Sequence, residues 1–102
     1  MKKLFISQPM RGLTDEEILK AREEIRARAE HAIGEPVELI DSFIKDYSKE
    51  INKSIPVWCL GKSIQFLSQA DIAYLGGNWR NARGCKIEHE VARIYGIKII
   101  EA

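Results

Sequence analysis

The sequence predicts a three-layer α/β domain, in which helices cover both faces of a small parallel sheet. Four short apolar runs alternate along the chain with three segments of helical periodicity, an order that favours parallel strands joined by right-handed crossovers. The 102 residues suffice for one such domain, and no linker, repeat or low-complexity tract divides them. We therefore expect a single domain over residues 1–102.

The first strand and the first helix have clear boundaries. Residues 3–7 form an apolar run that ends before Pro9, because proline cannot donate a ladder hydrogen bond. Thr14 is followed three residues later by a glutamate, the spacing of a capping box, so a helix is expected to start there and to end at Gly34. The Glu, Lys and Arg residues of this helix are expected to face solvent. Its apolar positions at helical spacing are Ile18, Ala21, Ile25, Ala29 and Ala32 or Ile33.

The middle of the chain predicts a second strand and a second helix. Residues 37–40 form a short, mostly apolar run that predicts a second strand, and the polar segment 41–54 is expected to be a loop or to hold one helical turn. Pro56 suits the first turn of a helix, because its missing N–H has no partner there in any case. That helix is expected to reach about Gln69.

The last third of the chain repeats the strand-helix-strand order. Residues 71–75 form an apolar strand that Gly76 and Gly77 end abruptly. A third helix is expected from near Gly84 to Gly96, followed by a last strand at 97–100. Its predicted inward residues are Ile87, Val91 and Ile94. In open α/β sheets ligands bind outside the carboxyl ends of the strands, near the switch in strand order, so we look for a site there.

Composition and charge exclude several classes of function. The chain carries 16 Lys plus Arg against 15 Asp plus Glu, a formal net charge of +1, which offers no single-sign field to a nucleic acid polymer or a membrane. No stretch approaches the roughly 18 apolar residues that cross a bilayer. Cys59 and Cys85 lack metal or CxxC spacing, which favours free thiols in a reducing compartment. We expect a cytoplasmic protein with no metal and no cofactor.

The loop after the first strand is a candidate anion site. Its backbone N–H groups and the following helix dipole suit a monophosphate or a sugar, with Arg11 as the counter-charge. The alternative is an ordinary turn that Pro9 and Gly12 shape, with Arg11 in water. The loop is neither a Walker loop nor a GxGxxG fingerprint, so ATP-driven chemistry and dinucleotide binding lose support. Its residues are Ser7, Gln8, Pro9, Met10, Arg11, Gly12, Leu13 and Thr14.

The polar segment at residues 76–90 is the second candidate. Glu88 is expected on the inner side of the last helix, where a partly buried carboxylate can act as nucleophile or acid/base in glycosyl transfer. Alternatively, Glu88 accepts hydrogen bonds from a neighbouring loop, or it pairs with Arg11 or Arg83. His89 is adjacent to Glu88 in the helix, and adjacent helical residues do not converge on one ion.

Three further residues of this segment suit a ligand or a structural role. Trp79 can stack on a base or cover a pocket, but a loop tryptophan is at least as often a hydrophobic plug. Asn78 and Asn81 can bond a sugar or base edge, or they can serve turns and the helix N-cap.

Five motifs together resemble one known family over nearly the whole chain. They are FISQPMRG at 5–12, LGKS at 60–63, AD at 70–71, GNW at 77–79 and ARGCKIEHE at 82–90. In this combination the chain resembles the short, functionally unassigned branch of the nucleoside 2-deoxyribosyltransferase-like superfamily. The resemblance implies a flavodoxin-like or Rossmann-like fold, a homodimer or higher homo-oligomer, and a nucleoside or nucleotide as the small-molecule partner.

The resemblance also implies which residues form the site. Glu88 matches the glutamate that attacks the anomeric carbon of deoxyribose in active members, which implies a retaining mechanism. The implied substrate-binding residues are Ser7, Gln8, Pro9, Met10, Arg11, Gly12, Asn78, Trp79, Arg83 and Gly84.

Two positions depart from the pattern of active members. Ser63 stands where they carry the aspartate that protonates the leaving base, and Ala82 stands where they tend to carry a hydroxyl residue. Without an acid the base would leave poorly, although Asp15 or Glu16 near the first loop is a possible substitute. Two hypotheses follow: an N-glycosidase or deoxyribosyltransferase that uses Glu88, or a non-catalytic nucleotide-binding or sensing module with the same pocket.

Overall fold

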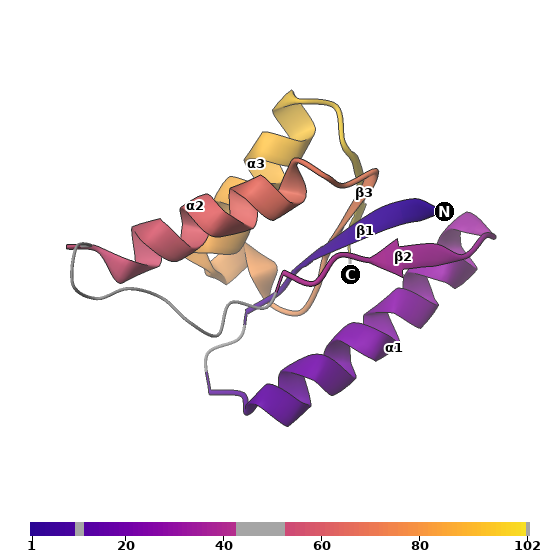
Figure 1. Ribbon diagram of the computed structural model, residues 1–102, viewed down its shortest axis with the longest axis horizontal. Helices are drawn as coiled ribbons and strands as arrows, with labels where there is room; N and C mark the ends of the chain where they lie inside the picture. Colours follow the sequence, from indigo (N-terminus) through magenta and orange to yellow (C-terminus); the bar gives the residue numbers. More distant parts are fainter. Residues whose placement is uncertain (10–11, 43–52, 102) are drawn as a thin grey trace.

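The computed structural model describes residues 1–9, 12–42 and 53–101. Strands and helices alternate in this part of the chain as the sequence predicts (Figure 1). A short 3-10 helix that the sequence did not predict, η1, lies between the third strand and the third helix. The elements are β1 (Lys2–Ser7), α1 (Asp15–Ile33), β2 (Val37–Leu39), α2 (Ile55–Leu67), β3 (Ile72–Leu75), η1 (Trp79–Asn81), α3 (Arg83–Ile94) and β4 (Lys98–Glu101).

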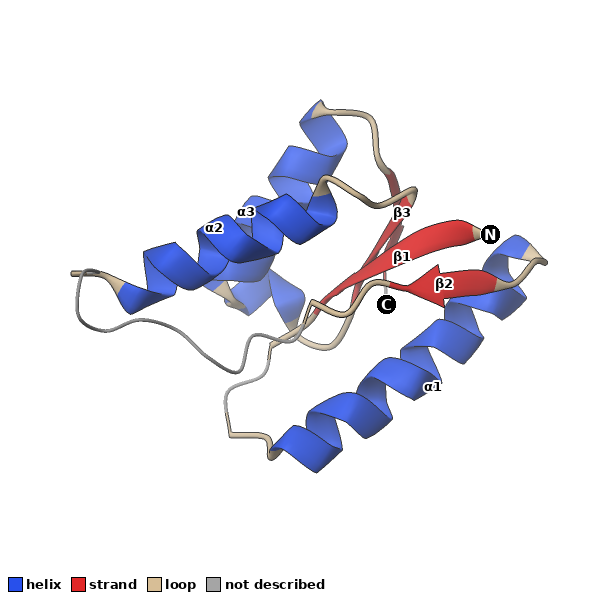
Figure 2. Cartoon of the chain, in the orientation of Figure 1, coloured by secondary structure: helices blue, strands red, loops and turns tan. Residues whose placement is uncertain are grey.

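The strands form one parallel sheet in the order β2-β1-β3-β4 (Figure 2). A flavodoxin-like sheet begins with this strand order. All strands run parallel, but the chain adds β2 on one side of β1 and β3 on the other, so the switch point lies between β1 and β3. The two strands run in register to their last residues, where Ser7 pairs with Leu75. The α/β fold with a small parallel sheet is therefore confirmed, and its switch point lies where β1 and β3 end.

Helices cover both faces of the sheet, α1 on one and α2 with α3 on the other (Figure 1). Because side chains alternate along a strand, β1 sends Leu4 and Ile6 to the α1 face and Phe5 to the other. The core residues of the α1 face are Leu4, Ile6, Ile25, Ala29, Val37, Ile72 and Tyr74. Those of the opposite face are Phe5, Ile40, Leu67, Ala73, Leu75, Trp79, Cys85 and Ala92.

Both ends of α1 are capped as the sequence predicts. The Thr14 hydroxyl accepts a hydrogen bond from the Glu17 amide, and the Glu17 carboxylate accepts one from the Thr14 amide. At the other end Gly34 takes the left-handed conformation, with φ 75°, and its N–H donates to the Glu30 carbonyl. The capping box and the glycine cap are therefore confirmed.

The inward face of α3 differs from the prediction. Ile87 and Ile94 are 45% and 60% exposed, whereas Cys85, Glu88 and Ala92 are buried. The small side chains of Cys85 and Ala92 let α3 approach the sheet closely, and this orientation leaves the isoleucines on the outer side. The expected inward positions of Ile87 and Ile94 are therefore wrong, while the inner position of Glu88 is confirmed.

Two other details also correct the sequence-based expectations. Arg22 was expected to face solvent, but it is buried, because it lies on the same face of α1 as Ile18 and Ile25. The N-cap of α3 is Ala82 rather than an asparagine. Of the predicted loop at 41–54, residues 43–52 lie outside the described residues.

Candidate functional site

A buried hydrogen bond joins the end of β1 to α3 at the switch point of the sheet. The Ser7 hydroxyl donates to Oε1 of Glu88 at 2.7 Å, and the two residues are 3% and 8% exposed. Ser7 follows Phe5 by two residues, so its side chain points to the face that α3 covers. The sequence reasoning placed both residues in the site but did not foresee that they are bonded to each other.

Glu88 is a buried carboxylate. Burial raises its pKa, and three groups oppose that rise: hydrogen bonds from the Ser7 and Ser63 hydroxyls and the positive charge of Arg22. Ser63 on α2 therefore acts on Glu88 through a neutral hydroxyl. Such a carboxylate is poorly hydrated, yet hydroxyl donors hold it in place.

Cys85 belongs to the same cluster, one turn before Glu88 on α3. Its thiol is in hydrogen-bond contact with Ser7, and burial, with a smaller contribution from the Glu88 charge, raises the pKa of the thiol. The thiol is therefore a neutral neighbour of the carboxylate. The sequence reasoning treated Cys85 as a buried free thiol, and its burial is confirmed.

Arg22 brings a buried positive charge to this edge of the sheet from the opposite helix layer. It is 4% exposed, and its Nη1 donates to the Ser42 hydroxyl at 3.0 Å, just after β2. Burial lowers its pKa, while the charges of Asp41 and Glu88 partly restore it. An arginine and a carboxylate thus lie on either side of the end of β1. The sequence reasoning missed Arg22, although its spacing from Ile18 and Ile25 fits the buried stripe.

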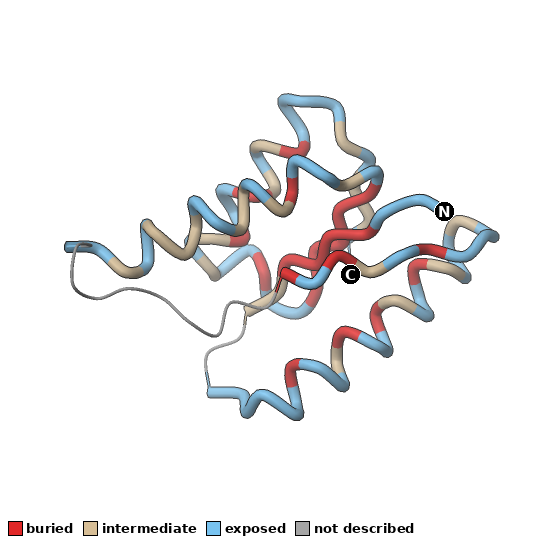
Figure 3. The backbone as a smooth tube through the Cα atoms, viewed as in Figure 1, coloured by how far each residue is buried: buried red, intermediate tan, exposed pale blue. Residues whose placement is uncertain are grey.

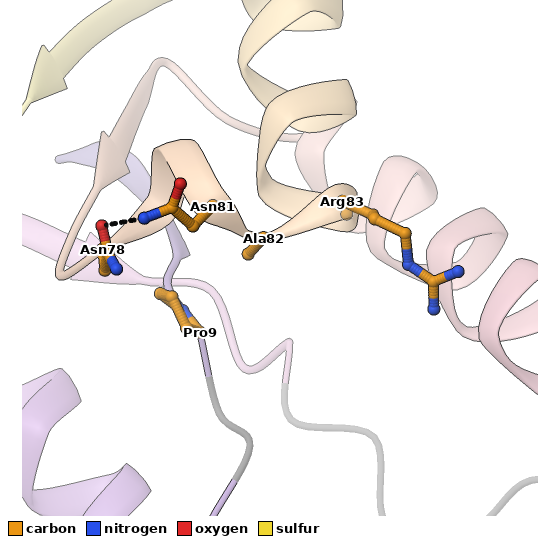
Figure 4. Close-up of a pocket in the computed structure, with 6 residues that line it drawn as sticks. Pro9, Asn78, Asn81, Ala82 and Arg83 are labelled. Carbon is orange, nitrogen blue, oxygen red and sulfur yellow. Dashed lines mark hydrogen bonds between the residues drawn. The ribbon is translucent and has the colours of Figure 1, made fainter.

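A pocket of about 420 Å³ opens beside this cluster. Its lining comes from the loop after β1, from the residues around η1 and from the start of α3 (Figure 4): Pro9, Asn78, Asn81, Ala82, Arg83 and Gly84. Asn81 donates its Nδ2 to Oδ1 of Asn78 at 2.9 Å, whereas the Arg83 side chain points away from both asparagines. Glu88 does not line this pocket, because it is buried one turn further along α3.

The start of α3 faces the pocket without a side-chain cap. Ala82 occupies the N-cap position and supplies no side-chain hydrogen bond. The first N–H groups of a helix have no partner within the helix, and the helix dipole adds partial positive charge there. This end of the pocket therefore suits a negatively charged or oxygen-rich ligand.

Trp79 lies in the core rather than in the pocket wall. It is 6% exposed, its ring stacks on His89 at 4.5 Å between centroids, and the Arg80 guanidinium lies 4.6 Å from the ring centroid. Glu101 then bonds both His89, at 3.0 Å, and Arg80, at 3.2 Å. This placement favours the interpretation of Trp79 as a hydrophobic plug over that of a base-stacking platform.

The other predicted site residues are only partly brought together. Pro9, Asn78, Arg83 and Gly84 line one pocket. Gln8 lines a smaller hollow on the α1 side. Its buried Nε2 has no hydrogen-bond partner among the described residues. Gly12 is exposed, with φ 84°, and lines neither hollow. Met10 and Arg11 lie outside the described residues, so the predicted counter-charge stays a prediction.

Two expected absences concern metals and membranes. Within residues 1–9, 12–42 and 53–101, no three His, Cys, Asp or Glu side chains come together as a metal site would require. None of the helices in that part of the chain is both long and apolar enough to cross a membrane.

Comparisons with known proteins describe the domain but not its activity. A family described as a domain of unknown function, DUF4406, matches residues 2–101. No curated protein matches the chain. A solved structure described as a conserved protein from Enterococcus faecalis V583 is similar with a TM-score of 0.62 and 14% identity, over 99% of this chain. At that identity the likeness shows the fold alone, and this chain spans 62% of that protein.

Proposed function

The chain belongs to the DUF4406 family of domains of unknown function, and we propose that it cleaves or transfers at the N-glycosidic bond of a nucleoside or nucleoside monophosphate. In this proposal Glu88 is the nucleophile, and the pocket one turn before it on α3 holds the substrate. Because Glu88 is buried and does not line that pocket, the proposal requires the carboxylate to become accessible from the pocket when the substrate binds. The observation that carries the proposal is the buried Ser7–Glu88 hydrogen bond of 2.7 Å at the switch point of the sheet.

The environment of Glu88 suits a nucleophile. Burial removes water that would otherwise stabilise the carboxylate, and a poorly hydrated carboxylate is more ready to form a bond. The Ser7 and Ser63 hydroxyls fix its orientation, and the charge of Arg22 favours its ionised form. A surface glutamate such as Glu90, which pairs with Arg93, has none of these features.

The proposed reaction has two balanced steps. A Glu88 carboxylate oxygen bonds to C1′ of the sugar while the C1′–N bond breaks, and the base leaves with that electron pair and takes a proton from water. Water, or a nitrogen of a second base, then attacks C1′ and releases the carboxylate, and the attacking group loses a proton to solvent. Two displacements at the same carbon retain its configuration.

The pocket supports a nucleoside-sized ligand with an anionic group. Its volume of about 420 Å³ lies within the range of small-molecule sites. The uncapped start of α3 offers backbone donors to a phosphate or to sugar hydroxyls. Asn78 and Asn81 supply amide groups for the edge of a base or a sugar.

One observation favours a second function, a non-catalytic nucleotide-binding or sensing module. Among residues 1–9, 12–42 and 53–101, the side chains that act on Glu88 are Ser7, Ser63 and Arg22, and none of these is a carboxylic acid that could protonate a leaving base. Asp15 and Glu16 lie exposed in the first turn of α1. In this alternative Glu88 accepts hydrogen bonds from the ribose hydroxyls. The cytoplasmic location and the lack of a nucleic acid polymer partner stay predictions.

An HPLC time course tests the proposal. Purified protein is incubated with deoxyribonucleosides and their monophosphates, with and without a free acceptor base, beside Glu88→Gln and the matched control Glu90→Gln. Base release or exchange that Glu88→Gln abolishes and Glu90→Gln retains is the expected result. If no base is released across the panel, the enzyme proposal fails. Saturable binding of the same nucleotides by calorimetry then supports the second function.

A further inference from the structure

The two asparagines of the candidate pocket lie on a segment that is too short to be stable by itself. Asn78 precedes η1 and Asn81 ends it, and the hydrogen bonds of this turn are the Asn81 amide to the Asn78 carbonyl, 3.1 Å, and the Ala82 amide to the Trp79 carbonyl, 3.0 Å. Residues 77–81 are exposed except Trp79, whereas β3 before them is buried (Figure 3). A single 3-10 turn is a weak element, because few hydrogen bonds offset the ordering of its backbone. The position of the asparagines therefore depends on what holds Trp79.

Side chains from three elements hold Trp79. We call them the Trp79 cluster: Trp79 and Arg80 of η1, His89 of α3 and Glu101 of β4. The His89 ring stacks on the indole with 24° between the planes and 4.5 Å between the centroids, and the Arg80 guanidinium lies 4.6 Å from the indole centroid. Stacking and cation–π contacts have preferred geometries, so they restrict how the ring can turn. The indole is therefore fixed by side chains of both η1 and α3.

Glu101 joins the two groups that contact the indole. Its Oε1 lies 3.0 Å from Nε2 of His89, and its Oε2 accepts a hydrogen bond from Nη2 of Arg80 at 3.2 Å. Glu101 is in register with Leu75, the residue at which β3 ends and the chain leaves for η1. An isolated exposed ion pair contributes little, but a carboxylate that bonds two groups on one ring is part of a network. Glu101 can therefore hold this loop although it does not line the pocket.

We propose that Glu101 is a positioning residue of the candidate pocket: through the Trp79 cluster it fixes η1, and η1 fixes the two asparagines. The side chains of Asn78 and Asn81 share a hydrogen bond of 2.9 Å, so a shift of η1 moves both amides together. The Nδ2 of Asn78 and the Oδ1 of Asn81 are not used in that bond, and the cluster presents them to a ligand in one arrangement. In taking this pocket as the ligand site, the inference rests on the proposed function.

Glu90 offers a matched control for Glu101. It is a glutamate that lines the same surface hollow as Trp79, Arg80 and His89. Its carboxylate, however, bonds Arg93 one turn further along α3 rather than a member of the cluster. Replacing either glutamate by alanine removes the same charge from the same side of the molecule. A difference between the two variants therefore reports the hydrogen bonds of Glu101 and not the change in charge.

Hydrogen exchange followed by NMR tests the inference on the protein without any ligand, so its failure is separate from a failure of the proposed function. The Trp79 Nε1 is buried without a hydrogen-bond partner among the described residues, so its exchange reports the opening of the cluster. Glu101→Ala should speed the exchange of this indole N–H and of the Ala82 amide by roughly fivefold or more, because η1 opens locally. The amide of Ala29, buried in α1 on the other face, should keep its rate. Glu90→Ala should leave all three rates unchanged.

The side-chain amide signals of Asn78 and Asn81 separate positioning from a general structural role. In Glu101→Ala these signals should shift or broaden, while thermal melting shows that the chain is still folded. Glu101→Gln keeps an acceptor oxygen for Arg80, so its signals should lie closer to those of the wild type. Asparagine signals and indole exchange that Glu101→Ala leaves unchanged overturn the proposal. An equal rise of exchange at Ala29 overturns it as well, because Glu101 would then support the whole fold and not the pocket.

Discussion

The two faces of the sheet share the same strands but are covered in different ways. On one face α1 is capped at both ends and packs its apolar stripe on the core. On the other face α3 starts without a side-chain cap and buries a carboxylate, and α2 buries Leu67 fully while Ile64 and Phe66 pack half-buried on the core. On the α1 face, the polar groups at the helix ends are hydrogen-bonded and the apolar stripe is buried. On the other face, the N–H groups at the start of α3 have no side-chain cap and α2 stays partly exposed, so this face can bind other molecules.

This difference separates stability from function within one small domain. Features that raise stability, such as caps and apolar burial, are concentrated on the α1 face. Features that lower it, such as the buried Glu88 and the glycine within α2, are concentrated on the other face. Functional sites commonly carry such local costs. Arg22 is the exception, because α1 contributes it to the site from the stable side.

The largest expected effect tests the stable face. Ile25 is 6% exposed and packs in the cluster with Leu4, Ile6 and Tyr74. Ile25→Ala should lower the free energy of unfolding by about 2–4 kcal/mol, because it removes buried methyl groups and leaves a cavity. Leu19→Ala on the same helix, at a side chain that is 47% exposed, should change it by about 0.5 kcal/mol or less. Urea denaturation measures both, and equal losses would contradict the assigned stripe.

The cap of α1 gives the next effect. Thr14→Ala removes the hydroxyl that accepts from the Glu17 amide and should cost about 1 kcal/mol in the free energy of unfolding. Thr14→Ser keeps a hydroxyl at the same place and should retain most of that stability. The same urea experiment measures both variants. If Thr14→Ser loses as much as Thr14→Ala, the capping box does not hold α1.

The fold was predictable from the sequence because its signals are local. Proline and glycine mark the ends of strands, and the capping box fixes the start of α1 within a few residues of chain. The strand-helix alternation then leaves a parallel sheet as the consistent arrangement. The 3-10 turn at Trp79–Asn81 was missed because its polar residues also suit an irregular loop.

The site was predictable only where one segment determines it. Glu88 could be placed on the inner side of α3 from helical spacing, and Ser7 from its place at the end of a strand. The effects of Arg22 and Ser63 on Glu88 come from two other helices, so no local sequence pattern could have predicted them. The rotation of α3, which exposes Ile87, follows from close packing on the sheet and not from apolar periodicity.

A pH-dependent effect tests the functional face. Burial raises the pKa of Glu88 in the folded protein above the ordinary value of 4.5, so the folded chain holds this proton more tightly than the unfolded chain. Stability from this group is present below the unfolded pKa and is lost as pH rises through the folded pKa. Glu88→Gln should match the wild type near pH 4 and be more stable by about 1 kcal/mol at pH 8.

Thermal melting from pH 4 to pH 8 measures that difference. Glu90→Gln, at an exposed residue of the same helix, should show no such rise. A Glu88→Gln chain that is less stable than the wild type at pH 8 would mean that the hydroxyl hydrogen bonds and the positive charge of Arg22 outweigh the cost of burying the carboxylate.

The smallest expected effect tests whether the uncapped start of α3 is reserved for a ligand. Ala82 already has the extended backbone of an N-cap, with φ −107° and ψ 123°, so Ala82→Ser can cap α3 without rearrangement. The free energy of unfolding should rise by about 0.5–1 kcal/mol. If a phosphate binds the same N–H groups, the new cap competes with it, and calorimetry should show a several-fold loss of affinity for a nucleoside monophosphate but not for the nucleoside. Equal affinities would place the phosphate elsewhere in the pocket.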